Sequence, residues 1–117
     1  MTRILVVDDE REIAHIVGEV LADEGYEVRV AANGREALRQ VADFEPQVIV
    51  TDYMMPVMDG ATLYREVQRQ AAYQAIPFIV MSAVTSLPAD LQRASFVAKP
   101  FTVEMLLATV SRVISSQ

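Results

Sequence analysis

Polar side chains that could bind a cation and accept a phosphoryl group stand directly after four short apolar runs of this sequence. They are Asp8, Asp9, Asp52, Ser82 and Lys99. Three carboxylates brought together would repel one another, and a cation would have to offset that cost. Carboxylate oxygens are hard ligands, and the chain has no cysteine and only one histidine. The residue types therefore indicate Mg²⁺, with Mn²⁺ or Ca²⁺ as substitutes.

Asp52 is the candidate nucleophile of this group. An aspartate can attack a phosphoryl group and form an acyl phosphate. Catalysis of such a transfer is mainly positioning and charge neutralisation, which Mg²⁺ and Lys99 would supply, and Ser82 could donate a hydrogen bond once the phosphoryl group has arrived. The group contains no general base. This fits an activated donor such as a phosphohistidine, because no hydroxyl has to be deprotonated.

Each of these residues also has an ordinary structural interpretation. Asp8 and Asp9 could lie in a solvated loop with one helix N-cap, and Asp52 could belong to a turn. Ser82 could cap a loop, and Lys99 could be a surface charge. The functional interpretation is favoured when all five are taken together, because each of them stands at the end of a predicted strand.

The apolar runs alternate with amphipathic stretches along the chain. The predicted strands are residues 4–7, 26–31, 48–51, 78–81 and 96–98. The predicted helices lie around residues 13–21, 35–41, 60–70 and 102–114. Strands separated by helices form βαβ units, so we predict an α/β fold with a five-stranded, doubly wound parallel sheet. Ligands of such sheets bind beyond the carboxyl ends of the strands, where the five polar residues stand.

Composition and charge limit the classes of function. Sixteen acidic residues against ten basic ones give a net charge of −6, and no Lys/Arg cluster interrupts this balance. Such a surface repels phosphates, so we expect no direct nucleic acid binding by this domain. The sequence has no apolar run near the roughly 18 residues of a membrane helix and no secretory signal pattern. We therefore expect no membrane segment and, with no cysteine present, a cytoplasmic location.

The sequence resembles the receiver domain of bacterial two-component response regulators over essentially its whole length, residues 1–117. Its most specific part is DYMMPVMDG at residues 52–60, which is similar to the family's segment after the phosphorylated aspartate. The other matching motifs are the acidic pair Asp8-Asp9, the switch hydroxyl with its small neighbour Ser82-Ala83, and the corner Lys99-Pro100-Phe101. The resemblance implies a flavodoxin-like fold.

The resemblance also implies a role for each matched residue. Asp52 would be the phosphorylation site. The Mg²⁺ ligands would be Asp9 directly, Asp8 largely through water, Asp52 itself and the backbone carbonyl of Met54. Lys99 would contact the phosphoryl group and, in its absence, Asp52.

A second set of matched residues would act as the switch. Ser82 and its neighbour Ala83 would contact the phosphoryl group, and Phe96 would rotate inward as Ser82 moves. The alternative for Phe96 is a permanent core aromatic. The resemblance further implies a cis peptide bond between Lys99 and Pro100, which an X–Pro bond tolerates at low cost.

The chain departs from the family between Ser82 and Lys99. This stretch is shorter than usual, and the missing residues fall on the family's fourth helix. Residues 84–88 are loop-like, and only residues 89–93 could form a helical turn. We therefore predict a shortened or missing fourth helix. In the family that helix contributes to the output and dimer face, so we expect phosphorylation chemistry to be retained better than standard output.

The leading hypothesis is a phospho-acceptor signalling switch. It would take a phosphoryl group from a histidine kinase or phosphotransfer protein and change its surface toward an effector domain or a second copy. One alternative is a Mg²⁺-dependent phosphatase or phosphotransferase, but such enzymes usually need a carboxylate at the position of Met54. The other is a phosphorylation-independent interaction module, which the shortened stretch favours and the intact motifs oppose.

Overall fold

The computed structural model of the chain describes residues 1–84, 86–91 and 93–116. The strands are β1 (Arg3–Val7), β2 (Glu27–Ala31), β3 (Val48–Asp52), β4 (Phe78–Ser82) and β5 (Ser95–Ala98). The α-helices are α1 (Arg11–Asp23), α2 (Gly34–Phe44), α3 (Gly60–Gln68) and α4 (Val103–Ser115). Two short 3₁₀ turns are η1 (Ala71–Tyr73) and η2 (Ala89–Leu91).

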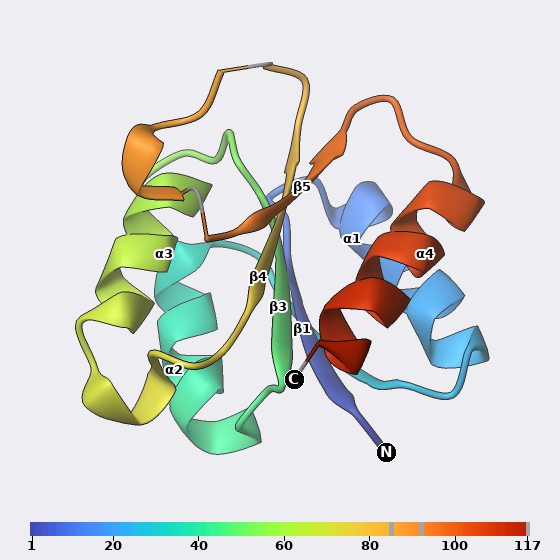
Figure 1. Ribbon diagram of the computed structural model, residues 1–117, viewed down its shortest axis with the longest axis horizontal. Helices are drawn as coiled ribbons and strands as arrows, with labels where there is room; N and C mark the ends of the chain where they lie inside the picture. The colour runs from blue at the N-terminus through green and yellow to red at the C-terminus, as the bar shows by residue number, and fades with distance from the viewer. Residues whose placement is uncertain (85, 92, 117) are drawn as a thin grey trace.

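All five strands are parallel, in the order β2-β1-β3-β4-β5. Figure 1 shows the sheet between two helical layers, with α2 and α3 on one face and α1 and α4 on the other. The prediction of a doubly wound α/β fold is therefore confirmed. Because β1 lies between β2 and β3, the strand order reverses there, and this is where such sheets bind ligands.

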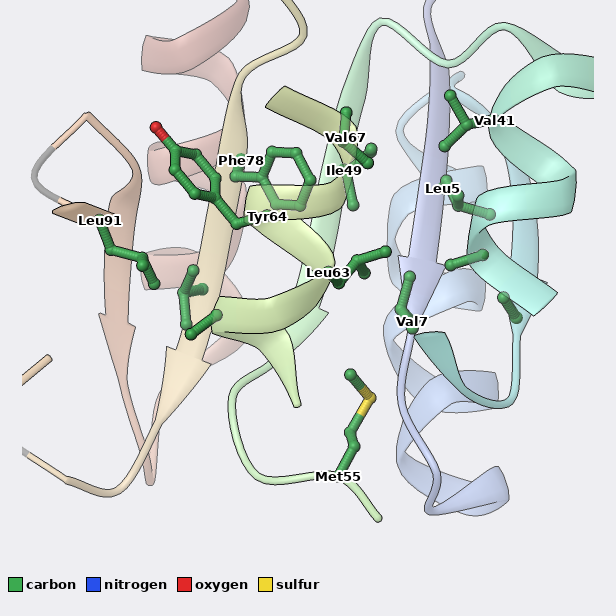
Figure 2. Packing of buried hydrophobic residues seen from close by; sticks show 14 of the residues in the cluster. Leu5, Val7, Val41, Ile49, Met55, Leu63, Tyr64, Val67, Phe78 and Leu91 are labelled. Carbon is green, nitrogen blue, oxygen red and sulfur yellow. The ribbon is translucent and has the colours of Figure 1, made fainter. Parts of the chain in front are cut away.

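The three inner strands are buried along almost their whole length, as their continuous apolar sequences predict for strands covered on both faces. Their side chains alternate between two clusters, one under each helical layer. Figure 2 shows the cluster under α2 and α3, with Leu5 of β1 and Ile49 of β3 at its centre. At its rim, Tyr64 of α3 packs edge-on against Phe78 of β4, with ring centroids 5.1 Å apart.

Three helices begin at side-chain caps. The side chain of Asn33 accepts a hydrogen bond from the backbone of Glu36 at the start of α2. Asp59 and Thr102 cap α3 and α4 in the same way. Such caps satisfy backbone N–H groups that have no partner within the helix. Because α3 follows the strand that ends in Asp52, its cap fixes the backbone beside the candidate site.

The connection between β4 and β5 contains only the turn η2 among its described residues, so the prediction of a missing fourth helix is confirmed. Leu91 of this turn is buried in the core cluster under α3. Asp90 receives two hydrogen bonds from Arg65 of α3, at 2.6 and 3.1 Å. The connection is thus held against α3 by one apolar anchor and one ion pair.

Element boundaries differ modestly from the sequence prediction. Helix α2 is longer than the predicted residues 35–41, and α3 ends at Gln68, before the predicted residue 70. The turn η1 that follows α3 was not predicted. Of the helices in the described part of the chain, none has the length and apolar character to cross a lipid bilayer.

Candidate functional site

The five predicted site residues lie at the carboxyl ends of four neighbouring strands. Asp52 and Ser82 are the last residues of β3 and β4, Asp8 and Asp9 follow β1, and Lys99 follows β5. Because the sheet is parallel, these ends share one edge, the upper edge in Figure 1. The sheet therefore brings residues from distant parts of the sequence to one place.

The three carboxylates form one cluster. One oxygen from each of Asp8, Asp9 and Asp52 lies within 4.8 Å of the other two. Asp8 is 1% exposed, and its Oδ1 accepts a hydrogen bond from the backbone of Glu10 at 2.9 Å. Its Oδ2 is buried without any hydrogen-bond partner in the described structure. An unpartnered buried carboxylate oxygen beside two further carboxylates fits a divalent cation such as Mg²⁺.

The environment of Asp8 disfavours the charged form of its carboxyl group. Burial raises the pKa of its carboxyl from 3.8 to about 6, and the charge of Asp52 adds to the increase. The hydrogen bond from the Glu10 backbone and the charge of Lys99 lower the pKa but offset only part of it. The ionised form of Asp8 is therefore costly in the metal-free protein, and a cation at the cluster would relieve that cost.

Asp52 is held by Lys99. The Lys99 Nζ donates a hydrogen bond to Asp52 Oδ1 at 2.8 Å, and the Asp52 side chain is only 6% exposed. Burial lowers the pKa of Lys99, but the Asp52 hydrogen bond and the nearby acidic charges outweigh it, so the pKa lies above its usual value. Lys99 is therefore a fixed positive charge at this site. The ion pair engages one oxygen of Asp52 and leaves the other for a second interaction.

Gly60 is a site residue that sequence reasoning missed. Gly60 ends the segment of residues 52–60 and was given no role of its own, whereas the structure packs it directly against the end of β3. A Cβ atom at Gly60 would lie 2.6 Å from the carbonyl oxygen of Asp52 and 3.1 Å from Tyr53 Cα. The Gly60 N–H also donates a hydrogen bond to the Tyr53 carbonyl at 2.8 Å. Only glycine allows α3 to start this close to the aspartate.

Ser82 and its neighbours lie on the opposite side of Asp52 from β1. Ser82 is 2% exposed, and its hydroxyl oxygen accepts a hydrogen bond from the Val84 N–H at 3.0 Å. Ala83 is exposed. The residue that the resemblance implies as switch aromatic, Phe96, is 38% exposed, so it lies at the surface of this conformation.

The remaining predicted residues lie at the rim. Met54 is 66% exposed, two residues after Asp52. The peptide bond between Lys99 and Pro100 is cis, as the resemblance implies. Glu10, which was not predicted, contributes a negative charge that raises the pKa of Lys99. Its position directly after the acidic pair was the signal that could have identified it.

The loop after Asp52 contains a residue in an unfavourable backbone conformation. Val57 has a φ of 71°, which β-branched residues rarely adopt, and it is 86% exposed. We expect Val57→Asn to raise the free energy of unfolding by about 1 kcal/mol, because asparagine tolerates this region. Urea unfolding measures the change. Val57→Ile keeps the branched side chain as a control, and an equal gain in that variant would contradict the explanation.

Residues 4–111 match the protein family described as response regulator receiver domain. The chain belongs to this family, whose members are phospho-acceptor switches of two-component signalling. Receiver domains act as signalling switches and are generally not enzymes with separate substrates. The acidic cluster at the end of β1 and β3 fits the Mg²⁺ site of the family.

Individual relatives agree with this assignment. Response regulator MprA of Mycolicibacterium vanbaalenii is 37% identical over 111 residues, which cover 91% of this chain and 47% of MprA. The chain thus spans about half the length of that relative. Chemotaxis protein CheY4 of Vibrio cholerae is 38% identical with a TM-score of 0.89, covering 97% of this chain and 98% of CheY4. The receiver domain of a Syntrophus aciditrophicus histidine kinase is 33% identical, with a TM-score of 0.88 and coverage of 99% and 92%.

Proposed function

We propose that Asp52 accepts a phosphoryl group from a phosphohistidine while Mg²⁺ is bound by the acidic cluster. The observation that carries this proposal is the unpartnered, buried Asp8 Oδ2 beside the Asp52–Lys99 ion pair. The three carboxylates need a positive charge to offset their repulsion, and Asp52 is already oriented beside them by its ion pair with Lys99. The ligands would be Asp9, Asp52, Asp8 largely through water, and the Met54 carbonyl, with Mn²⁺ as a substitute for Mg²⁺.

The residues of the chain have separate tasks in this transfer. The Asp52 oxygen that Lys99 does not engage attacks phosphorus, the new O–P bond forms and the P–N bond to the donor imidazole breaks. The electron pair of that bond returns to the imidazole. No proton has to leave Asp52, which accounts for the absence of a general base among the predicted site residues. When bound, Mg²⁺ would supply positive charge that offsets the charge on the phosphoryl oxygens.

Lys99 then changes partner. In the unphosphorylated protein its ammonium group is bound to Asp52 Oδ1. Phosphorylation of Asp52 removes the negative charge of its carboxylate and brings the negative phosphoryl oxygens to the site. The Lys99 ammonium group would therefore pair with a phosphoryl oxygen. Lys99 therefore stabilises both the acceptor before transfer and the acyl phosphate after it.

The output of the switch begins at Ser82. In the present conformation the Ser82 oxygen accepts from Val84, so its hydroxyl hydrogen is free to be donated. We propose that this hydroxyl donates to the phosphoryl group, and that Ala83 moves with it. Phe96, on the neighbouring strand, would turn inward into the space that Ser82 leaves.

The partners follow from the chemistry. The donor would be a sensor histidine kinase or a phosphotransfer protein, in a cytoplasmic setting. Neighbours in structure include receiver domains within longer proteins, one joined to a GGDEF domain. An effector domain or a second copy of this chain would read the changed surface. The whole protein's output is part of this proposal, because the chain covers only part of MprA.

The proposal is tested by phosphorylation in vitro. The protein is incubated with Mg²⁺ and acetyl phosphate and weighed intact. We expect one added phosphoryl group that is absent in Asp52→Asn and when Mg²⁺ is chelated. Asp43→Asn is the matched control. Asp43 is an exposed aspartate that pairs with Arg29 and is not one of the site residues, so this variant should react normally.

The same experiment separates the alternatives. Rapid multiple turnover of acetyl phosphate without an accumulated adduct would favour a small phosphatase. No adduct at any Mg²⁺ concentration would favour a phosphorylation-independent interaction module. Either result would contradict the proposed switch.

We expect the acyl phosphate to be long-lived. Met54 and Val84 stand beside Asp52 and Ser82 in the sequence and carry apolar side chains, which cannot orient an attacking water. Met54→Asn is expected to shorten the lifetime about tenfold, the effect of one added hydrogen bond to that water. Intact mass at timed intervals after removal of the donor measures the lifetime. A wild-type lifetime of only seconds would contradict this prediction.

A further inference from the structure

A groove runs along the flank of α3 that faces the β4–β5 connection, away from the carboxylate site. Its first part is a cavity of about 270 Å³ whose lining includes Tyr64, Gln68, Ile76, Phe78 and Arg93. Its second part, of about 430 Å³, is lined by Tyr64, Arg65, Gln68, Arg69 and Asp90. The two parts share the lining residues Tyr64 and Gln68, so they lie next to each other, and together they are called the α3 groove.

The groove exists because the β4–β5 connection is short. A helix between these strands would lie beside α3, whereas here only the turn η2 does so. In Figure 1 this turn lies against one end of α3, and η1 lies at the other end. Between the two turns, Gln68 at the end of α3 and Arg69 after it line cavities instead of packing against a further helix.

The first cavity has the chemistry of an anion site, although the protein as a whole is negatively charged. Its described lining contains no acidic residue, although the chain has a net charge of −6. Arg93 has no ion-pair or hydrogen-bond partner among the described residues. Gln68 lies beside it in the lining, and its amide nitrogen makes only one hydrogen bond, a long one of 3.3 Å to the Gln74 carbonyl. Two donors with unused capacity, Arg93 and Gln68, therefore line this cavity.

The cavity also has an apolar side. Ile76, which is partly exposed, contributes to its lining, whereas the rings of Tyr64 and Phe78 are buried and pack edge-on against each other, as Figure 2 shows. A ligand that combines a carboxylate with an apolar group therefore matches this lining. A free inorganic anion would leave the apolar side unfilled.

The second cavity already binds a carboxylate from the chain itself. Asp90 of η2 is held by both nitrogens of the Arg65 fork, at 2.6 and 3.1 Å. Both side chains are about half exposed, so this ion pair is accessible to exchange. Arg69 lies at the same end, paired with Glu66 at 3.2 Å. The internal acid shows what kind of group this end of the groove accepts.

We propose that the α3 groove binds an acidic segment of a partner protein, with an apolar residue of that segment against Ile76 and a carboxylate on Arg93. A second carboxylate of the segment competes with Asp90 for Arg65. This surface goes beyond the proposed phosphoryl transfer, uses none of its residues and replaces the face that the missing helix would have formed.

The test uses a labelled, end-capped peptide with one phenylalanine between pairs of glutamates, and fluorescence anisotropy at low salt. Wild-type protein is expected to bind it saturably, and the same peptide with glutamine in place of glutamate at least tenfold more weakly. Arg93→Gln is expected to weaken binding about tenfold. Asp90→Asn is expected to tighten it, because Arg65 is freed.

Arg112→Gln is the matched control, since Arg112 is exposed on α4, on the opposite face of the sheet. Chemical shift changes of backbone amides should map to α3 and residues 93–94. Equal binding by Arg93→Gln and Arg112→Gln, equal binding of the glutamine peptide, or no saturable binding would overturn the proposal. Phosphorylation of Arg93→Gln by acetyl phosphate shows independently whether Asp52 remains functional, so the two proposals can fail separately.

Discussion

Replacing Asp8 by asparagine is expected to raise the free energy of unfolding of the metal-free protein at pH 7 by about 3 kcal/mol. The figure follows from the pKa of Asp8, which burial raises from 3.8 to about 6 in the folded protein. Asparagine keeps the oxygen that accepts from the Glu10 backbone. In place of the unpartnered Asp8 Oδ2 it offers an N–H group that can donate to Asp52.

The pH dependence gives this prediction a definite sign. A carboxyl whose folded pKa is raised binds its proton more tightly in the folded state, so folding is favoured at low pH. Stability from this group is present below about pH 4, decreases between about pH 4 and 6 and is constant above. The gain from Asp8→Asn should therefore be large at pH 7 and small at pH 4.

Urea unfolding in the presence of a chelator measures this gain at both values of pH. Asp9→Asn is the matched control, because Asp9 is exposed and its change should have little effect without metal. Addition of Mg²⁺ should raise the melting temperature of the wild type strongly and that of Asp8→Asn weakly. A destabilised Asp8→Asn protein, or one whose gain is the same at pH 4 and 7, would show that the site does not have this electrostatic cost.

Replacing Gly60 by alanine is expected to destabilise the protein by about 1–3 kcal/mol and to slow phosphorylation of Asp52. The added methyl group would lie 2.6 Å from the Asp52 carbonyl oxygen, a backbone atom that cannot rotate away. Either α3 or the end of β3 must shift. The nucleophile, its Lys99 contact and the carboxylate cluster are all carried by that strand end, so the shift reaches the chemistry.

Gly18→Ala is the matched control for this substitution. Gly18 lies inside α1, and its new methyl group would meet Val30 Cγ2 at 3.5 Å, an ordinary van der Waals distance. Because alanine is the better helix former, this variant should gain up to about 1 kcal/mol. Denaturant unfolding and the initial rate of labelling by acetyl phosphate measure both effects. Wild-type stability and rate in Gly60→Ala would contradict the proposed close contact.

The acidic site could be predicted from the sequence because its residues stand directly after predicted strands. Each of Asp8, Asp52 and Ser82 ends a run of apolar residues, and in a parallel sheet such ends must meet. The missing helix was also predictable, because residues 84–88 have neither the period nor the composition of a helix. Local patterns are sufficient for these features.

Features that depend on contacts across the fold were not predictable. The raised pKa of Asp8 depends on how deeply its carboxyl is buried, and no local pattern records that. The requirement for glycine at position 60 comes from the carbonyl of Asp52, which meets it only when α3 has been placed. The α3 groove depends on an element that is missing, and its lining comes from α3, the start of β4 and Arg93.

The order in which the chain is synthesised gives the Asp52–Lys99 ion pair a further consequence. Asp52 precedes Lys99 by 47 residues, and β1 and β3 are neighbours, so a nascent chain that has emerged through α3 can already assemble its carboxylates. Lys99 follows β5, the edge strand that is added last. In such a nascent chain the three carboxylates would lie together while Lys99, which pairs with Asp52, is still within the ribosome. Cellular Mg²⁺ would then assist the folding of this domain during its synthesis, before the domain takes part in signalling.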